Sequence, residues 1–320
     1  MTGVLEAVEA VCSALRKLGY VVTRVPLALP IEEAEEQLRK LDADLVFNLF
    51  EGFCGYPKTE ADIADMLSAL GTPYTGSTGR VLRLALDKVK TNTLLRINGI
   101  NTPDFQLLDV SSIAAFDLRH PCIVKPPAED ASHGISERSI IYNTASLKEQ
   151  VAFINYTYGS QALVEEFIDG REFNITVIGN NKRISLPVSE IEYSLPEDKP
   201  HILTFAAKWK PDSLYFKGTR VVCPAEIDDE ERRRIEETAI AVFGLLGCHG
   251  YARVDIRLDG MGKLYVIEVN PNPDISPGSG VVRQAEAAGL TYIQLIERIV
   301  QLALEKEEGE TKDTADAKRR

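Results

Sequence analysis

The strongest constraint on the fold comes from two strand-like arms near the C-terminus, residues 251–258 and 263–270, joined by a glycine-containing turn. Both arms are rich in apolar and β-branched residues, which indicates a β-hairpin whose two faces alternate along each strand. One face is apolar and suits a core: Val254, Ile256, Ile267 and Val269. The other carries two carboxylates, an amide and a guanidinium: Arg253, Asp255, Glu268 and Asn270. An even-numbered loop would set Glu268 opposite Arg253.

The polar face of this hairpin is suited to a cation. Carboxylate and amide oxygens are the ligands that Mg²⁺ prefers, and Mg²⁺ takes few protein ligands while keeping positions for water and phosphate. The alternative is a solvated outer face, which is the weaker interpretation because residues 270–273 end the strand abruptly. The sequence therefore predicts a metal site with Asp255, Glu268 and Asn270 as ligands.

Charge and cysteine usage exclude several classes of protein. The net charge of −12 argues against nucleic-acid or anionic-membrane partners. No apolar run approaches a membrane span, and the first residues do not resemble a signal peptide. The five cysteines are scattered and never form CxxC, which favours reduced thiols in the cytoplasm. An acidic protein of this kind binds anions through local cations and a metal.

The first part of the chain predicts an α/β layer with a parallel sheet. Helical periodicity at 4–18, 31–41 and 60–70 alternates with strand-like segments at 20–25 and 45–50. Because the chain opens on a helix, a first strand is either missing or upstream of this start. A break at 73–77 precedes a further predicted helix over 79–97.

The remaining chain predicts more strands than helices. Strands dominate from 100 to 180 around one helix near 145–155, and further helices are expected at 228–246 and 291–305. The stretch 201–220 is long, polar and aromatic, which is typical of a lid over an active site. Residues 306–320 are charged and nearly devoid of apolar side chains, so we expect a disordered tail.

Nucleotide-binding signals occur without a Walker loop or GxGxxG. Lys125 ends an apolar strand just before a proline, a costly position unless the ammonium meets an anion. A small-residue loop over 131–135 follows and suits close approach of backbone N–H groups to phosphate. The strand end at 163–168 suits an adenine edge, and Glu172 suits ribose hydroxyls. Taken one at a time, Lys125 and Glu172 are explained as well by exposure on the surface as by nucleotide binding.

The order of these motifs resembles the ATP-grasp superfamily, and specifically its D-alanine–D-alanine ligase branch. The similar segments run through most of the chain: 44–49, 73–77, 87–88, 102–103, 123–126, 164–165, 170–172, 207–208, 223–225, 247–250, 253–255 and 268–270. The resemblance implies three α/β domains (α+β in part), with ATP grasped between the central and C-terminal ones. Their expected bounds are 1–77, 78–180 and 181–305.

The resemblance also implies roles for individual residues. Lys88 and Lys125 would bind the phosphates under a loop containing Ser132 and Gly134. Glu165 and Ile168 would edge the adenine, Ile267 would pack beneath it and Glu172 would hold the ribose. Lys208 would reach the γ-phosphate from the lid, and Arg253 would stabilise the transferring phosphoryl group. Ser279 would hold a substrate carboxylate. Mg²⁺, or Mn²⁺ in its place, would sit in one or two positions on Asp255, Glu268 and Asn270.

Departures from the family pattern fall in the amino-acid pockets. The family's N-terminal glutamate, which receives the first D-alanine, is absent, and its place is near Thr2. The family's His-Gly segment corresponds to residues 51–58, whose sequence differs from the family pattern. Ala131 replaces a serine of the family's phosphate loop, and Trp209 replaces the family's lid tyrosine. The family's Pro-Gly pair corresponds to Pro273-Asp274. Glu51 is the reserve partner for an amine. Asp274 disfavours a second anionic D-alanine and favours a neutral or cationic amine.

The sequence therefore predicts a cytoplasmic ATP-dependent carboxylate–amine ligase that forms an amide through an acyl phosphate. Its partners would be a small-molecule acid and amine, with a substrate altered from D-alanine and a homodimer allowed. A true D-alanine–D-alanine ligase, a ligase using a thiol or bicarbonate, and a non-catalytic nucleotide-binding protein are the alternatives. The last needs no charge-dense metal cluster, so intact Asp255, Glu268 and Asn270 argue against it.

Overall fold

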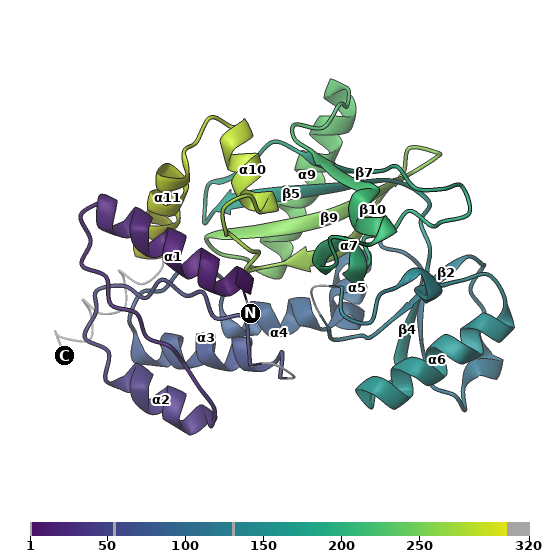
Figure 1. The fold of residues 1–320 in the computed structure, drawn as a ribbon, viewed down its shortest axis with the longest axis horizontal. Helices are drawn as coiled ribbons and strands as arrows, with labels where there is room; N and C mark the ends of the chain where they lie inside the picture. The colour runs from purple at the N-terminus through teal and green to yellow at the C-terminus, as the bar shows by residue number, and fades with distance from the viewer. Residues whose placement is uncertain (1, 54–55, 130–131, 306–320) are drawn as a thin grey trace, which may run out of the picture.

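The fold is built on two antiparallel sheets with helices around them, as Figure 1 shows. The computed structural model describes residues 2–53, 56–129 and 132–305. The smaller sheet has the order β1-β4-β2-β3 and is covered by α6. Its elements are β1 (Phe105–Leu108), β2 (Cys122–Lys125), β3 (Ile140–Ile141), β4 (Ala162–Glu166), α6 (Thr144–Tyr158) and the 3₁₀ turns Ile113–Ala115 and Glu137–Ser139.

The larger sheet has the order β10-β9-β5-β7-β8, with β6 on the side of β5. Its strands are β5 (Gly170–Gly179), β6 (Arg183–Ser185), β7 (Ser189–Tyr193), β8 (Thr219–Val222), β9 (Tyr251–Asp259) and β10 (Leu264–Asn270). β5 pairs with β7 and β9. The chain passes from the smaller to the larger sheet between β4 and β5, whereas the domain bounds expected from the sequence, 78–180 and 181–305, stay a prediction.

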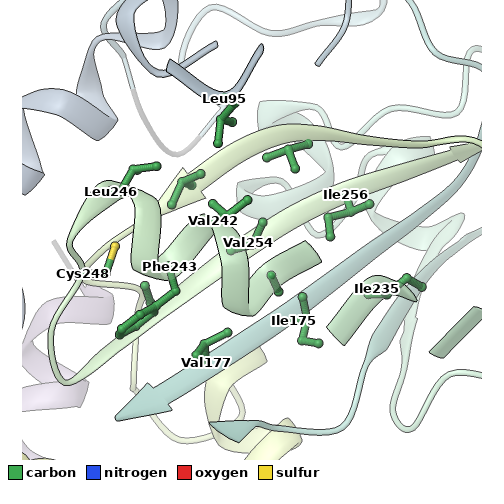
Figure 2. Close-up of a cluster of buried hydrophobic side chains, with 14 of the residues drawn as sticks. Leu95, Ile175, Val177, Ile235, Val242, Phe243, Leu246, Cys248, Val254 and Ile256 are labelled. Carbon is green, nitrogen blue, oxygen red and sulfur yellow. The ribbon is translucent and has the colours of Figure 1, made fainter. Parts of the chain in front are cut away.

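The main core lies between this sheet and α9 (Asp229–Leu246). Buried apolar residues of α9 recur at helical spacing and pack on the inward positions of β5 and β9, as Figure 2 shows. They include Ile235, Val242, Phe243 and Leu246 on the helix, and Ile175, Val177, Val254 and Ile256 on the strands. Asp228 caps α9 by accepting from the Glu231 N–H at 2.8 Å.

The opposite face of the larger sheet is covered by the two ends of the chain. α1 (Thr2–Lys17), α10 (Gly280–Ala287) and α11 (Tyr292–Leu304) form a second core with Ile178 and Tyr251. Gln284 is fully buried here and is satisfied by the backbone of β5. Its Oε1 accepts from Thr176 N at 2.9 Å, and its Nε2 donates to Asn174 O at 2.8 Å. Among the described residues, no helix is long and apolar enough to cross a membrane.

The predicted parallel sheet of the first part is largely wrong. The helices α2 (Ile31–Arg39) and α3 (Thr59–Leu70) form, but 20–25 is not a strand and 45–50 contributes a single parallel bridge, Val46 to Tyr74. A strand needs a partner for its ladder of hydrogen bonds. Among the described residues, no strand pairs with the segment 20–25, and Val21 is 99% exposed.

The predicted single helix over 79–97 is two helices, α4 (Gly79–Leu86) and α5 (Lys88–Ile97). Asp87 separates them with a non-helical backbone, and its side chain accepts from the Lys90 N–H at 3.0 Å as the cap of α5. The break sets Lys88 at the first position of α5, where its side chain reaches the cavity described next.

Candidate active site

A cavity lies between the two sheets and encloses about 830 Å³ of space, part of it open to solvent. Segments far apart in the sequence contribute to its lining, from α5, β2, the loop after β2, β4, β9 and β10. Most of the predicted site residues line it: Lys88, Lys125, Ser132, Glu165, Ile168, Glu172, Lys208, Asp255, Ile267 and Glu268.

Lys88 joins the smaller sheet's loop to the hairpin. Its Nζ lies 3.0 Å from Glu268 Oε1 and donates to the carbonyl oxygen of Glu129 at 2.6 Å. Burial raises the pKa of the Glu268 carboxyl, but Lys88, Lys208 and Lys125 together lower that pKa to about 2. Glu268 is therefore ionised at neutral pH and balances the lysines of the cavity.

Lys125 is buried at the end of β2 and pairs with Glu165 on the neighbouring strand β4, Nζ to Oε2 at 2.6 Å. Asn92 of α5 donates to the other oxygen, Oε1, at 2.9 Å. The side chain of Glu165 is thus occupied, which leaves its predicted role at the adenine edge to the backbone. Asn92 is a site residue that the sequence interpretation missed.

The hairpin brings the predicted metal ligands together. Asn270 lies opposite Arg253, and Glu268 lies opposite Asp255, so all four share a face, although the expected pairing of Glu268 with Arg253 is wrong by two positions. Both oxygens of Asp255 accept from Arg253, at 2.7 and 2.9 Å. Asn270 Nδ2 also donates to Asp255, at 3.2 Å. The amide oxygen of Asn270 is not used in that bond, so the set retains the oxygen donors that suit Mg²⁺.

A β-bulge changes the role of one hairpin residue. The register shifts between Val266 and Glu268, so Ile267 is the extra residue. Ile267 consequently lines the cavity beside Glu268, and Val266 takes the buried core position. The prediction that Ile267 belongs to the core face with Val254 is therefore wrong, whereas its predicted place beneath a base in the cavity fits this geometry.

Glu172 does not offer a free carboxylate to the cavity. It is 5% exposed, and it accepts from Arg257 Nη2 at 2.5 Å and from the Tyr193 hydroxyl at 2.9 Å. Arg257 also donates to the carbonyl oxygens of Ile168, at 2.8 Å, and of His201. Sequence reasoning missed Arg257, although the period-two series 253, 255, 257 on one strand face pointed to it.

The segment 201–217 covers the cavity and contains two short helices, α7 (Phe205–Trp209) and α8 (Leu214–Lys217). It is tied to the loop after β2, because Ser132 Oγ donates to Leu203 O at 2.9 Å and Phe205 N donates to Ile135 O at 3.1 Å. Burial lowers the pKa of the Lys208 ammonium on α7, and the Arg253 guanidinium lowers it further. Lys208 lines the same cavity as Asp255 and Glu268.

Four predicted residues lie outside the cavity lining: Arg253 and Asn270, which are on the hairpin face described above, and Gly134 and Ser279. Gly134 has φ +77°, and a Cβ there would lie 2.8 Å from Tyr158 Oη and 2.9 Å from Pro126 Cγ, so glycine is needed to seat the loop against β2. Ser279 is the N-cap of α10, where its hydroxyl accepts from Val282 N at 3.5 Å. The predicted features at Ala131, in part of 51–58 and in the tail 306–320 lie outside the described residues, as does the Thr2 side chain.

Comparisons with known proteins agree on one family. The family model described as the D-ala D-ala ligase C-terminus matches residues 94–301. The chain is 37% identical over 260 residues to the uncharacterized protein y4sG of Sinorhizobium fredii, covering 81% of this chain and 74% of that protein. It is 33% identical to a D-alanine–D-alanine ligase of Gluconobacter oxydans, covering 92% of each chain.

Solved structures give the same likeness. A D-alanine–D-alanine ligase from Bacillus anthracis superposes with a TM-score of 0.74 at 25% identity, covering 95% of this chain and 93% of that one. The VanG D-Ala:D-Ser ligase from Enterococcus faecalis gives a TM-score of 0.67 at 25% identity, covering 82% and 74%. A Bacillus anthracis ligase structure complexed with ATP, at 23% identity, shares the fold with a TM-score of 0.73.

Proposed function

This chain belongs to the D-alanine–D-alanine ligase branch of the ATP-grasp superfamily, whose members join a carboxylate to an amine with ATP, and we propose that it forms an amide through an acyl phosphate in the cavity between its sheets. The observation that carries the proposal is the gathering of Lys88, Lys125 and Lys208 around the Asp255 and Glu268 carboxylates. Few other ligands need three ammonium groups and two carboxylates in one cavity as a Mg²⁺–triphosphate does.

In this proposal Lys88 and Lys125 hold the phosphates of ATP. Each lysine now contacts a carboxylate, so phosphate oxygens take over part of these contacts as the nucleotide enters. Asp255, Glu268 and the amide oxygen of Asn270 hold Mg²⁺, which cancels charge on the phosphates when bound. Arg257 keeps Glu172 oriented at the base and ribose end of the cavity.

The reaction follows from the same residues. A carboxylate is a poor electrophile, so its oxygen first attacks the γ-phosphorus of ATP, which gives an acyl phosphate and releases ADP. A neutral amine then forms the C–N bond, the C–O bond to phosphate breaks, and the proton on nitrogen leaves with the phosphate. Both steps depend on positioning and charge cancellation, which Arg253 and Lys208 supply beside Asp255.

The substrate pair is proposed to differ from two D-alanines. The relatives above include ligases named for different acceptors, D-alanine in one and D-serine in another. In this chain the residues around the nucleotide follow the family pattern, while Glu51, Trp209 and Asp274 depart from it. A true D-alanine–D-alanine ligase is the second candidate, and family membership favours it.

Cytoplasmic location completes the proposal, and the homodimer stays a prediction from the sequence. Four cysteines of the described residues, Cys12, Cys122, Cys223 and Cys248, are all free, which fits a reducing compartment. Burial raises the pKa of the Cys122 thiol to about 11, and the Glu166 carboxylate raises it further, so this thiol stays protonated and inert.

The test is ADP release from Mg·ATP with pooled D- and L-amino acids as carboxylate and amine. Wild-type protein should show amino-acid-dependent release, and Lys125→Met should lower kcat/KM by about 100-fold or more, because a phosphate contact is lost. Lys148→Met removes an exposed lysine of α6 and is the matched control. Retention of turnover by Lys125→Met, or no release with any pool, would contradict the proposal.

A further inference from the structure

Arg257 is a cation buried in the wall of the nucleotide cavity, on the same strand as Asp255. It is 4% exposed and lies directly opposite Glu172 on the neighbouring strand β5, with Nη2 and Oε2 2.5 Å apart. Removing a guanidinium from water is costly unless several partners offset the loss. The position therefore needs a set of partners that hold the charge in one orientation.

The partners of Arg257 come from three separate parts of the cavity wall. Nη1 donates to Ile168 O at 2.8 Å, in the link between β4 and β5 that is proposed to edge the base. Nη2 donates to Glu172 Oε2 and to the carbonyl oxygen of His201, the first residue of the covering segment 201–217. One guanidinium thus joins the base edge, the sugar carboxylate and the start of the covering segment.

The two carbonyl contacts distinguish this arrangement from an ordinary cross-strand ion pair. Such a pair needs only Glu172 as the partner of Arg257. Ile168 and His201 lie outside the strands, and their carbonyl oxygens accept from no backbone N–H of the described residues. A charged donor forms a stronger hydrogen bond than a neutral one, so Arg257 fixes two loop positions that no sheet ladder holds.

His201 is anchored to the same carboxylate by a second route. Its ring stacks on the ring of Tyr193, with centroids 5.3 Å apart and planes 12° from parallel. Tyr193 lies on β7, the other neighbour of β5 in the larger sheet (Figure 1), and its hydroxyl donates to Glu172 Oε2 at 2.9 Å. Burial raises the pKa of Tyr193 well above its ordinary value, so this hydroxyl remains a donor at neutral pH.

Glu172 keeps one oxygen for a ligand. Arg257 and Tyr193 both donate to Oε2, whereas Oε1 accepts no hydrogen bond from the described residues. Because Glu172 lines the cavity, Oε1 is the oxygen left to accept from the hydroxyls of a bound nucleoside. The ligand and the covering segment are therefore held by the two oxygens of one carboxylate.

We propose that Arg257 is a positioning residue that couples ribose binding to closure of the covering segment. Sugar hydroxyls that bind Glu172 hold the carboxylate in the orientation in which Arg257 also holds His201. The segment then brings Lys208 over the phosphates. A nucleotide without these hydroxyls still binds through its phosphates but leaves the segment less ordered. This inference rests on the proposed function and names the residue through which the ribose acts on the reaction.

The kinetic test compares ATP with 2′,3′-dideoxy-ATP, which lacks both sugar hydroxyls. Wild type should favour ATP by about 100-fold in kcat/KM, since each hydrogen bond to a charged group is worth about tenfold or more. Arg257→Met should reduce that preference to about tenfold or less, and Arg257→Lys should restore part of it. A merely structural role would lower kcat/KM equally for both nucleotides, and that result would overturn the proposal.

Arg220→Met is the matched control for the kinetic test. It removes an arginine of β8 in the same sheet and breaks an exposed ion pair with Glu192. This variant should keep the wild-type preference for ATP, because an exposed pair contributes little. Loss of the preference in Arg220→Met as well would assign the effect to the sheet as a whole and overturn the specific role of Arg257.

Protease protection tests the coupling without any substitution. At equal fractional saturation, adenosine should slow trypsin cleavage within 201–217 about threefold or more, whereas 2′,3′-dideoxyadenosine should have little effect. Arg257→Met should lose the protection by adenosine. Tyr193→Phe should keep most of it, because the ring stack and the Arg257 contact with His201 remain. Equal protection of wild type by the two nucleosides would overturn the proposal.

Amino-acid-dependent ADP release separates the two levels of inference. Intact release together with an unchanged ATP preference and unchanged adenosine protection in Arg257→Met would overturn the coupling and leave the ligase proposal standing. Protection that depends on the sugar hydroxyls and on Arg257, without ADP release for any amino-acid pool, would overturn the ligase proposal and leave the coupling standing.

Discussion

The substitution Glu268→Gln tests the charge balance of the nucleotide cavity. The lysines around Glu268 lower the pKa of its carboxyl from 4.5 to about 2 although burial opposes them, and the side chain is only 26% exposed. Because each pKa unit corresponds to about 1.36 kcal/mol, lowering this pKa to about 2 is worth about 3 kcal/mol of folding free energy at neutral pH. Glutamine keeps the shape of the side chain and loses its charge, so the variant should be less stable by about that amount.

The pH dependence gives the sign of this effect. The pKa of the folded state lies below that of the unfolded chain, so the contribution is complete above about pH 4.5 and is lost as the pH falls toward 2. The stability gap between wild type and Glu268→Gln should therefore close with falling pH.

Urea unfolding followed by circular dichroism measures this gap. Emission from the single tryptophan, Trp209, would report the covering segment rather than the whole fold. The control Glu35→Gln breaks an exposed pair with Arg39 and should cost less than about 1 kcal/mol. Equal stability of wild type and Glu268→Gln at pH 7, or a gap that stays constant between pH 7 and 3.5, would refute the reasoning.

Two further predictions concern the lid and a helix cap. Trypsin should cleave within 201–217 about tenfold more slowly when a nonhydrolysable ATP analogue and Mg²⁺ are present at ten times the dissociation constant. The reason is that the bound state orders the segment that carries Lys208. Equal cleavage rates with and without the analogue would remove the lid from the proposal. Ser279→Ala should lower the free energy of unfolding by about 1 kcal/mol because it removes the N-cap of α10, whereas Ser279→Thr should keep this cap. Urea titration measures the difference. An unchanged unfolding midpoint for the alanine variant would speak against the cap.

Strand alternation makes part of the site predictable from sequence. Away from a bulge, residues two apart on a strand share a face, so the amino-acid pattern alone places Arg253 with Asp255 on one face and Glu268 with Asn270 on one face. The predicted face is right even though the register is not, because an error of two positions preserves the side on which each residue points.

The same local logic fails in the first part of the chain. Apolar runs at 20–25 and 45–50 resemble buried strands, yet a strand exists only where another strand completes its hydrogen bonds. Val46 has a partner at Tyr74 for one bridge, and Val21 is exposed. Strand propensity alone does not predict whether a partner strand is present.

The sequence by itself determined which residue types lie on each face of the hairpin, where α9 begins and which nucleotide-binding family the chain belongs to, since these depend on short-range periodicity, capping and motif order. Only the tertiary structure decided that Lys88 meets Glu268, that Arg257 occupies Glu172, and that a bulge turns Ile267 into the cavity. Those pairings join residues up to 180 positions apart and depend on which strands become neighbours and on a one-residue slip, so no local pattern encodes them.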